Sequence, residues 1–167
     1  MNMLPWDKRP IEIANLFNPA FLALLLHEGS LAYYNEIQKG LPFELAPLLV
    51  TLPLHKETRD IMPKKISTQM HAWLLDHPEI KINCSKRIRN MNPYILESIA
   101  FGLKTGIINI DEDGKINSIG RTALSKKLKW NAELDPAKCL QRATFLGRWF
   151  AYAGDVSTVY IMWGITP

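Results

Sequence analysis

The residues best suited to chemistry form one short charged run, His55-Lys56-Glu57-Thr58-Arg59-Asp60, set between apolar Leu54 and Ile61. Histidine exchanges a proton near neutral pH, so a histidine close to Glu57 and Arg59 could support acid–base catalysis. Such catalysis would need a deep pocket at this run. The same residue types are also typical of a solvated helical turn or of a surface that docks a partner. The sequence leaves these three interpretations open.

The most basic segment covers residues 120–131 and contains cations that could contact nucleic-acid phosphates. These are Arg121, Lys126, Lys127 and Lys129, around Leu124, Leu128 and Trp130. Lys86, Arg87 and Arg89 are expected on the outer face of a helix and could add to them. Neither the charge density nor a known reading-helix pattern requires nucleic acid, so a solvated connector is the competing interpretation.

Two runs look like metal sites, and each fails at one position. His27-Glu28 begins a zinc-protease motif, but Leu31 stands where the second histidine is needed. Asp111-Glu112-Asp113-Gly114 looks like a calcium loop, but Thr122 stands where the bidentate glutamate is needed. The chain also lacks a Walker-type phosphate loop, a dinucleotide fingerprint and a Gly-x-Ser-x-Gly elbow. The sequence therefore predicts no metal and no cofactor, and it favours a non-enzymatic protein over an enzyme centred on His55, Glu57 and Arg59.

Length and composition favour one globular domain. With 167 residues and 47% hydrophobic content, the chain can bury about two-thirds of its unfolded surface without disulfides. Cys84 and Cys139 lack Cys-x-x-Cys spacing, which favours buried free thiols in a reducing compartment. There is no signal-peptide core, and no apolar run reaches the ~20 residues of a membrane span. We expect a cytoplasmic protein without membrane contact, whose net charge of +4 allows nucleic-acid or acidic partners but requires neither.

The predicted organising element is a helix with Asp135 as N-cap, Pro136 in its first turn and Gly154 just beyond its end. Two stripes at helical spacing run along it. The first is expected to be buried and consists of Cys139, Ala143, Leu146, Phe150 and Ala153. The second is basic and aromatic and consists of Lys138, Arg142, Phe145, Trp149 and Tyr152. A helix with two such faces needs two neighbours.

The basic and aromatic stripe has two interpretations. It is either ordinary core packed within this chain, or a surface on which Trp149, Tyr152, Arg142 and Arg148 bind a partner protein. Gly147 stands in the middle of the helix, where glycine costs about 1 kcal/mol relative to alanine. Its presence predicts that another backbone passes close by.

The rest of the pattern predicts a mainly helical α+β fold. Asn18-Pro19 and Asn92-Pro93 are start signals for helices, and Gly29 and Ser30 predict a bend in the first of them. Residues 41–54 are expected to form short, kinked and buried helical pieces, because they contain three prolines. We predict a single domain over residues 1–167, with a helical part over 1–92 and a helix-hairpin-helix-strand part over 93–167.

A small sheet is expected in the second part. Ile107 to Ile110 and Lys115 to Ile119 predict a hairpin, because the four residues between them favour a tight turn. The apolar run Thr158 to Ile165 predicts a covered strand that completes a wing-like three-stranded sheet.

Five stretches stand in order along nearly the whole chain: Asn18-Pro19-Ala20-Phe21 with Leu24-Leu25, Leu52 to Arg59, Gly106 to Asp111, Leu146 to Ala151, and Gly164 to Pro167. Together they resemble the middle component of bacterial three-component ABC systems. The resemblance implies a small non-enzymatic protein encoded beside an SMC/Rad50-like ABC ATPase and a separate effector protein. It also implies a role in conflict with phages or other mobile DNA. It carries over no catalytic residue.

The first hypothesis is an adaptor that couples the ATPase to the effector. It would dock through the face of Arg142, Arg148, Trp149 and Tyr152, and through His55, Lys56, Glu57 and Arg59. The second hypothesis is a winged-helix-like module that binds DNA through the basic segment 120–131. The sequence leaves open the effector, the trigger, the stoichiometry and whether the chain forms a homodimer.

Overall fold

A computed structural model describes residues 4–120, 123–128 and 130–165. Its helices are α1 (Ile11–Leu16), α2 (Pro19–Ile37), α3 (Ala46–Leu54), α4 (Lys56–Ile61), α5 (Met70–Asp76), α6 (Cys84–Thr105), α7 (Ser125–Leu128), α8 (Asp135–Tyr152) and α9 (Val156–Met162). Its strands are β1 (Leu41–Pro42), β2 (Ile108–Ile110) and β3 (Lys115–Ser118). Turns of 3-10 helix cover Trp6–Lys8, Phe43–Leu45 and Pro78–Lys81. The predicted class, predominantly helical α+β, is confirmed.

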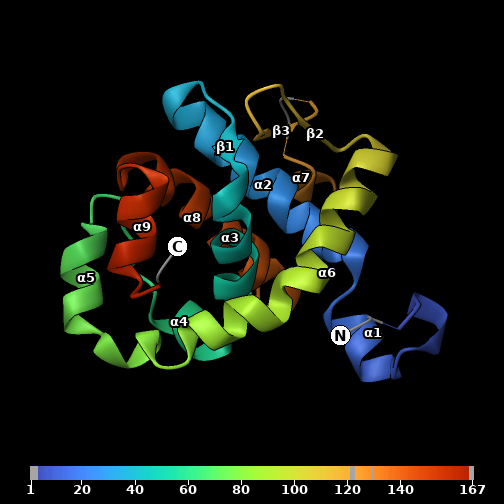
Figure 1. Cartoon of the computed structure of the whole chain (residues 1–167), viewed down its shortest axis with the longest axis horizontal. Helices are drawn as coiled ribbons and strands as arrows, with labels where there is room; N and C mark the ends of the chain where they lie inside the picture. Colours follow the sequence, from blue (N-terminus) through green and yellow to red (C-terminus); the bar gives the residue numbers. More distant parts are fainter. Residues whose placement is uncertain (1–3, 121–122, 129, 166–167) are drawn as a thin grey trace.

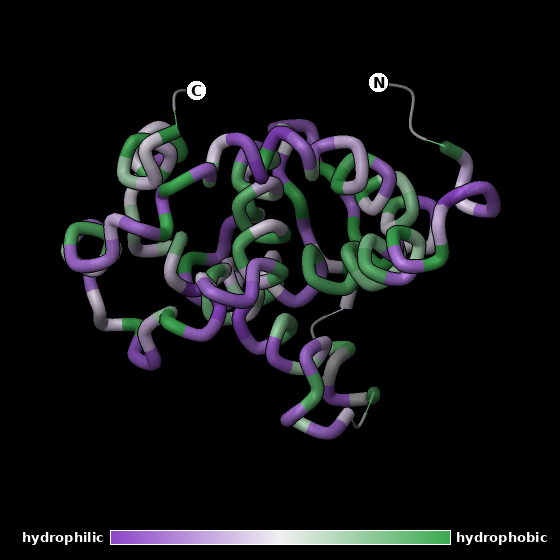
Figure 2. Tube along the Cα trace, turned by 90° about the horizontal axis from the view of Figure 1, so that it is seen from below, coloured by the Kyte–Doolittle hydropathy of each residue, from purple (hydrophilic) through white to green (hydrophobic). Residues whose placement is uncertain are grey.

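The core is built around α2. The Asn18 side chain accepts hydrogen bonds from the backbone N–H groups of Ala20 (2.9 Å) and Phe21 (3.4 Å), so this predicted helix start is confirmed. From Leu22 to Tyr33 every residue except Leu24 is buried. α8 and α6 pack along α2, and α3 contacts all three helices (Figure 1). Figure 2 shows hydrophobic and hydrophilic residues alternating along the helices, as expected where each helix buries one side.

The backbones of α2 and α8 touch where the two helices cross. A Cβ atom placed on Gly147 would lie 2.0 Å from the carbonyl oxygen of Gly29 and 3.1 Å from its Cα. No side chain fits into that space, so the close approach predicted from Gly147 is confirmed. The sequence predicts a bend at Gly29, but α2 is continuous through this residue. The Gly29 carbonyl instead lies at the crossing, against Gly147 of α8.

The sheet has three antiparallel strands in the order β1-β3-β2. Its hairpin follows the prediction: the Asp111 carboxylate accepts from the backbone N–H groups of Asp113 (3.1 Å) and Lys115 (2.9 Å), and Gly114 has a φ of 70°. The third strand is Leu41–Pro42, which pairs with β3 at Ile116 and Lys115. The hairpin of the predicted three-stranded sheet is confirmed, but the prediction that Thr158 to Ile165 forms its third strand is wrong.

The segment predicted as a C-terminal strand forms helix α9 instead. The Asp155 carboxylate accepts a hydrogen bond from the backbone N–H of Thr158 at 2.7 Å and caps the helix. Val159 and Trp163 are fully buried at i, i+4 spacing, and Ile161 between them is exposed. A strand would have required cover on both faces, whereas this segment has one buried side.

Two predicted helix boundaries are also wrong. Asn92-Pro93 does not open a helix, because α6 continues through Pro93, and Figure 1 shows that helix changing direction between its first and second halves. The carbonyl that Pro93 leaves without a donor belongs to Arg89, an exposed residue, so water can solvate it. In α8, Leu134 is the N-cap and Asp135 is already the first helical residue.

Candidate functional site

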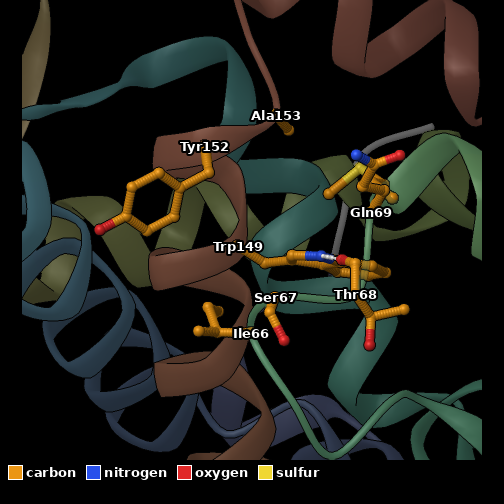
Figure 3. A pocket seen from close by; sticks show the side chains of 8 residues that line it. Ile66, Ser67, Thr68, Gln69, Trp149, Tyr152 and Ala153 are labelled. Carbon is orange, nitrogen blue, oxygen red and sulfur yellow. Dashed lines mark hydrogen bonds between the residues drawn. The ribbon is translucent and has the colours of Figure 1, made fainter.

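An apolar groove lies between α8 and the loop that joins α4 to α5 (Figure 3). It encloses about 320 Å³ and is lined by Ile66, Ser67, Thr68, Gln69, Met70, Trp149, Tyr152 and Ala153. We refer to this feature as the α8 groove. It contains two members of the stripe that the sequence marks as a candidate docking surface.

Two hydrogen bonds from α8 hold the loop that forms one wall of this groove. Arg142 donates from Nη1 to the carbonyl oxygen of Pro63 at 2.9 Å. Trp149 donates from Nε1 to the carbonyl oxygen of Thr68 at 2.7 Å, the bond drawn in Figure 3. The loop is therefore fixed near both of its ends. Arg142 does not line the groove but helps to hold its wall, since its guanidinium is hydrogen-bonded to Pro63 and lies over the Phe145 ring.

Trp149 belongs mainly to the core. Its side chain is only 2% exposed, and its ring packs edge-on against Trp73 at a centroid distance of 5.4 Å and against Phe145 at 5.3 Å. The docking interpretation therefore does not hold for the body of this side chain, because neighbours within the chain already cover it. Trp149 contributes an edge to the groove and supports its wall.

Tyr152 and Arg148 form the exposed part of the stripe. Tyr152 is 62% exposed, and Figure 3 shows its ring pointing away from the Trp149 indole. Its hydroxyl donates to one carboxylate oxygen of Glu36, at the end of α2, and Arg148 Nε donates to the other. These two donors lower the pKa of Glu36, and the hydrogen bond to Glu36 raises the pKa of Tyr152. A fixed aromatic ring beside a paired cation and carboxylate is suited to protein recognition.

Arg59, expected at a docking surface, is buried. Its side chain is 4% exposed and donates to the carbonyl oxygen of Pro53 (3.1 Å), Cys139 Sγ (3.1 Å) and a carboxylate oxygen of Asp135 (3.0 Å). These bonds tie α4 to the first turn of α8. The docking expectation is therefore wrong for Arg59, which connects two helices of the fold.

The other members of the charged run remain near the surface. Lys56 and Asp60 form an exposed i, i+4 ion pair, and Glu57 is exposed. His55 and Glu57 line an open depression, whereas Arg59 faces the interior. The trio on which an enzymatic interpretation depends does not converge on one cavity.

His55 is the N-cap of α4 and gives the protein a testable pH dependence. Its Nδ1 accepts from the backbone N–H of Thr58 at 3.3 Å. Burial lowers the pKa of His55 below its ordinary value of 6.5, and the charge of Arg87 lowers it further. The charge of Glu57 raises this pKa and so offsets part of the shift. The unfolded chain therefore takes up a proton at His55 more readily than the folded chain does. The contribution of neutral His55 to the free energy of unfolding is complete above pH 6.5 and is lost as the pH falls through the folded pKa.

We expect His55→Asn to reduce the loss of stability between pH 7.5 and pH 5. Asparagine keeps an acceptor for the Thr58 N–H but does not titrate. Urea unfolding at several pH values measures the effect, and His55→Ala provides the comparison that loses the cap, at a cost of about 1 kcal/mol at neutral pH. Identical pH profiles for wild type and His55→Asn would show that His55 plays no such part.

The basic residues do not form a single described surface. Arg121 and Lys129 lie outside the described residues, and for Lys127 only the backbone is described. Lys126 is exposed beside Trp130 at a hollow of about 380 Å³ along α8. Lys86 and Arg89 are exposed on α6 as predicted. Arg87 instead donates to the carbonyl oxygens of Ile82 (2.7 Å) and Ile80 (3.0 Å), which engages its guanidinium within the fold.

The two runs that look like metal sites in the sequence do not form metal sites in the described residues. His27 and Glu28 are buried in α2, where His27 Nδ1 lies 3.2 Å from Glu28 Oε1. Among the residues that the structure describes, no three His, Cys, Asp or Glu side chains are grouped so that they could hold a metal ion. Every helix in the described ranges is too short or too polar to cross a lipid bilayer.

Sequence reasoning missed two parts of the candidate site. Glu36 and the loop 66–69 are separated from Tyr152 by long stretches of chain, and neither carries a motif. The periodicity of α8 identifies the residues on one stripe, but it cannot show which neighbour covers each of them. The only signal was indirect, since two apolar faces on one helix require two neighbours.

Comparison with known proteins places the chain in a family. Neither the search of curated proteins nor the search of solved structures found a match. The family model described as ABC-three component (ABC-3C) system Middle Component 3 matches residues 6–167, nearly the full length. This confirms the resemblance seen in the five sequence stretches. The chain therefore belongs to the ABC-three component system Middle Component 3 family.

Proposed function

We propose that this protein is a non-enzymatic adaptor that joins an SMC/Rad50-like ABC ATPase to an effector in the cytoplasm, in defence against phage or mobile DNA. Membership of a middle-component family supports the adaptor role, because such a component has partners in its own system. The observation that carries the proposal on the structural side is the α8 groove with exposed Tyr152 at its edge. We propose that one of the two partners docks there.

The groove indicates what its partner should present. Its walls are mostly apolar, so an aliphatic or aromatic side chain would fill it. Lys64 and Lys65 are exposed on the loop that forms one wall, whereas Arg148, one turn before Tyr152 on α8, is already paired with Glu36. The expected partner segment therefore combines an apolar anchor with acidic neighbours.

We expect Tyr152→Ala to weaken binding of one partner by at least about thirtyfold, because tyrosine is one of the residue types enriched at binding hot spots. The free energy of unfolding should change by less than about 1 kcal/mol, since the ring is largely exposed and Glu36, which loses this hydrogen bond, keeps its ion pair with Arg148. The measurement is the affinity of the purified chain for the ABC ATPase and for the effector encoded beside it. Ile161→Ala, at a similarly exposed apolar side chain on α9 outside the groove, is the matched control.

Unchanged affinity of Tyr152→Ala for both partners would remove the α8 groove from the proposal. Failure of the wild-type chain to bind either partner would overturn the adaptor function itself.

A further inference from the structure

We propose that the chain has a second docking site, a depression between α4 and the start of α6 that takes a basic segment with an aliphatic side chain from a partner protein. The inference rests on the proposed adaptor function, because an adaptor needs two separate surfaces. The depression encloses about 660 Å³ and is lined by Glu57, Asp60, Ile61, Glu79, Ile82 and Arg87, together with neighbouring residues. His55 and Glu57, which the sequence marked for protein docking, both line it, and the remaining lining residues were not so marked.

The apolar part of this site consists of two isoleucines that the described chain leaves uncovered. Ile82 is 64% exposed, and Ile61, the last residue of α4, is 39% exposed. A single exposed isoleucine needs no explanation. Here two of them line the same depression as the buried Ile80, so an aliphatic side chain that enters it would meet apolar surface.

The charged part of the site is acidic. Three carboxylates, Glu57, Asp60 and Glu79, line it with one guanidinium, Arg87, which leaves two net negative charges. The whole chain carries a net charge of +4, so this depression has the opposite sign to the molecule around it. Lys56 and Arg59, which both pair with Asp60 from outside the lining, offset the charge at the Asp60 side, so the acidic character lies mainly at Glu57 and Glu79.

The cation within the site is already engaged. Arg87 donates to the carbonyl oxygens of Ile80 and Ile82, and these bonds hold the 3-10 turn that forms one wall. His55 remains neutral at physiological pH because burial lowers its pKa. Glu57 and Glu79 are exposed, and neither accepts a hydrogen bond from the Arg87 side chain. A partner that brings lysine or arginine meets carboxylates that can reorient toward it.

This chemistry differs from that of the α8 groove. The groove is flanked by lysines and favours an acidic segment, whereas the depression is rimmed by carboxylates and favours a basic one. Opposite charge preferences would direct two partners to two sites and prevent them from exchanging places. We therefore assign the depression to whichever partner does not occupy the groove.

The test compares two charge reversals in the full-length chain. Glu57→Lys with Glu79→Lys reverses the rim, and Glu112→Lys with Asp113→Lys makes the same change in charge on the exposed hairpin turn. Ile82→Ser provides a second, uncharged variant. Affinities for the purified ATPase and the purified effector are measured at 50 and 200 mM salt, after circular dichroism has shown that each variant is folded.

We expect the rim variant to lose at least about thirtyfold in affinity for one partner, with most of the loss at low salt, and to bind the other normally. Ile82→Ser should weaken the same partner at both salt concentrations, and the hairpin variant should bind like wild type. Carbodiimide coupling of the wild-type complex should join Glu57 or Glu79 to a lysine that has aliphatic neighbours in the partner. Wild-type affinity of the rim variant and of Ile82→Ser for both partners would overturn the second site while leaving the adaptor function intact.

Two other outcomes separate this inference from its alternatives. If the rim variant abolishes self-association of the chain but leaves both partner affinities unchanged, the occupant is a second copy and the assignment to a partner is wrong. If the wild-type chain binds neither protein, the proposed function fails and this inference fails with it.

Discussion

Gly147→Ala is expected to lower the free energy of unfolding by more than about 3 kcal/mol, or to prevent folding altogether. The new methyl group would lie 2.0 Å from the carbonyl oxygen of Gly29, where only backbone atoms can yield. The two helices would have to separate along their contact, which lies at the centre of the core. This cost outweighs the gain of about 1 kcal/mol that alanine brings to an ordinary helix position.

Gly102→Ala in α6 is the matched control for this prediction. A Cβ atom there would meet the Ile108 side chain at 2.8 Å, and a side chain can rotate away. We expect a change smaller than that of Gly147→Ala by at least about 2 kcal/mol, measured by urea unfolding of both variants. Equal stability of the two variants would show that α2 and α8 do not touch backbone to backbone.

Trp149→Ala should cost about 3–5 kcal/mol of stability, because it removes a large buried ring and leaves a cavity. The indole lies against Trp73 and Phe145, and its N–H binds the Thr68 carbonyl. Tyr152→Ala, three residues further along the same helix, should cost less than about 1 kcal/mol. The difference tests the division of the stripe into a core residue and a surface residue.

Thermal and urea unfolding of both variants would measure this difference. Trp149→Phe separates the two contributions of the indole, since it keeps an aromatic ring in the core but removes the donor to Thr68, at an expected cost of about 1–2 kcal/mol for the lost hydrogen bond. If Trp149→Ala were as stable as wild type, Trp149 would have to be a surface residue.

Local sequence signals predicted the features that depend on neighbouring residues. The Asn18 cap, the Asp111 turn and the free, buried cysteines were all readable because each depends on a few residues or on composition. Gly147 was the informative exception: its cost within a helix pointed to a long-range contact, and Gly29 provides it. A residue that is unfavourable where it stands therefore indicates tertiary structure.

The features that failed are those decided by distant packing. Thr158 to Ile165 is apolar enough for a strand, but burial of Trp163 beside distant Trp73 favours a helix. The Asp155 cap, which is local, supports the same helix. β1 has two residues, too few to show a period. Arg59 looks like a surface cation until its acceptors, contributed by α3 and α8, are known. The Arg59–Asp135 bond joins residues 76 positions apart, and the Trp73–Trp163 contact spans a still longer stretch of chain, which no local pattern records.

The most direct test of the adaptor role is whether the chain is required for its two proposed partners to associate. The two proposed partners, an ABC ATPase and an effector of the same system, are purified separately and mixed with or without the chain on a size-exclusion column. We predict that all three proteins co-elute in one complex and that the ATPase and effector elute separately when the chain is left out. Association of the ATPase with the effector to the same extent in its absence would contradict the account.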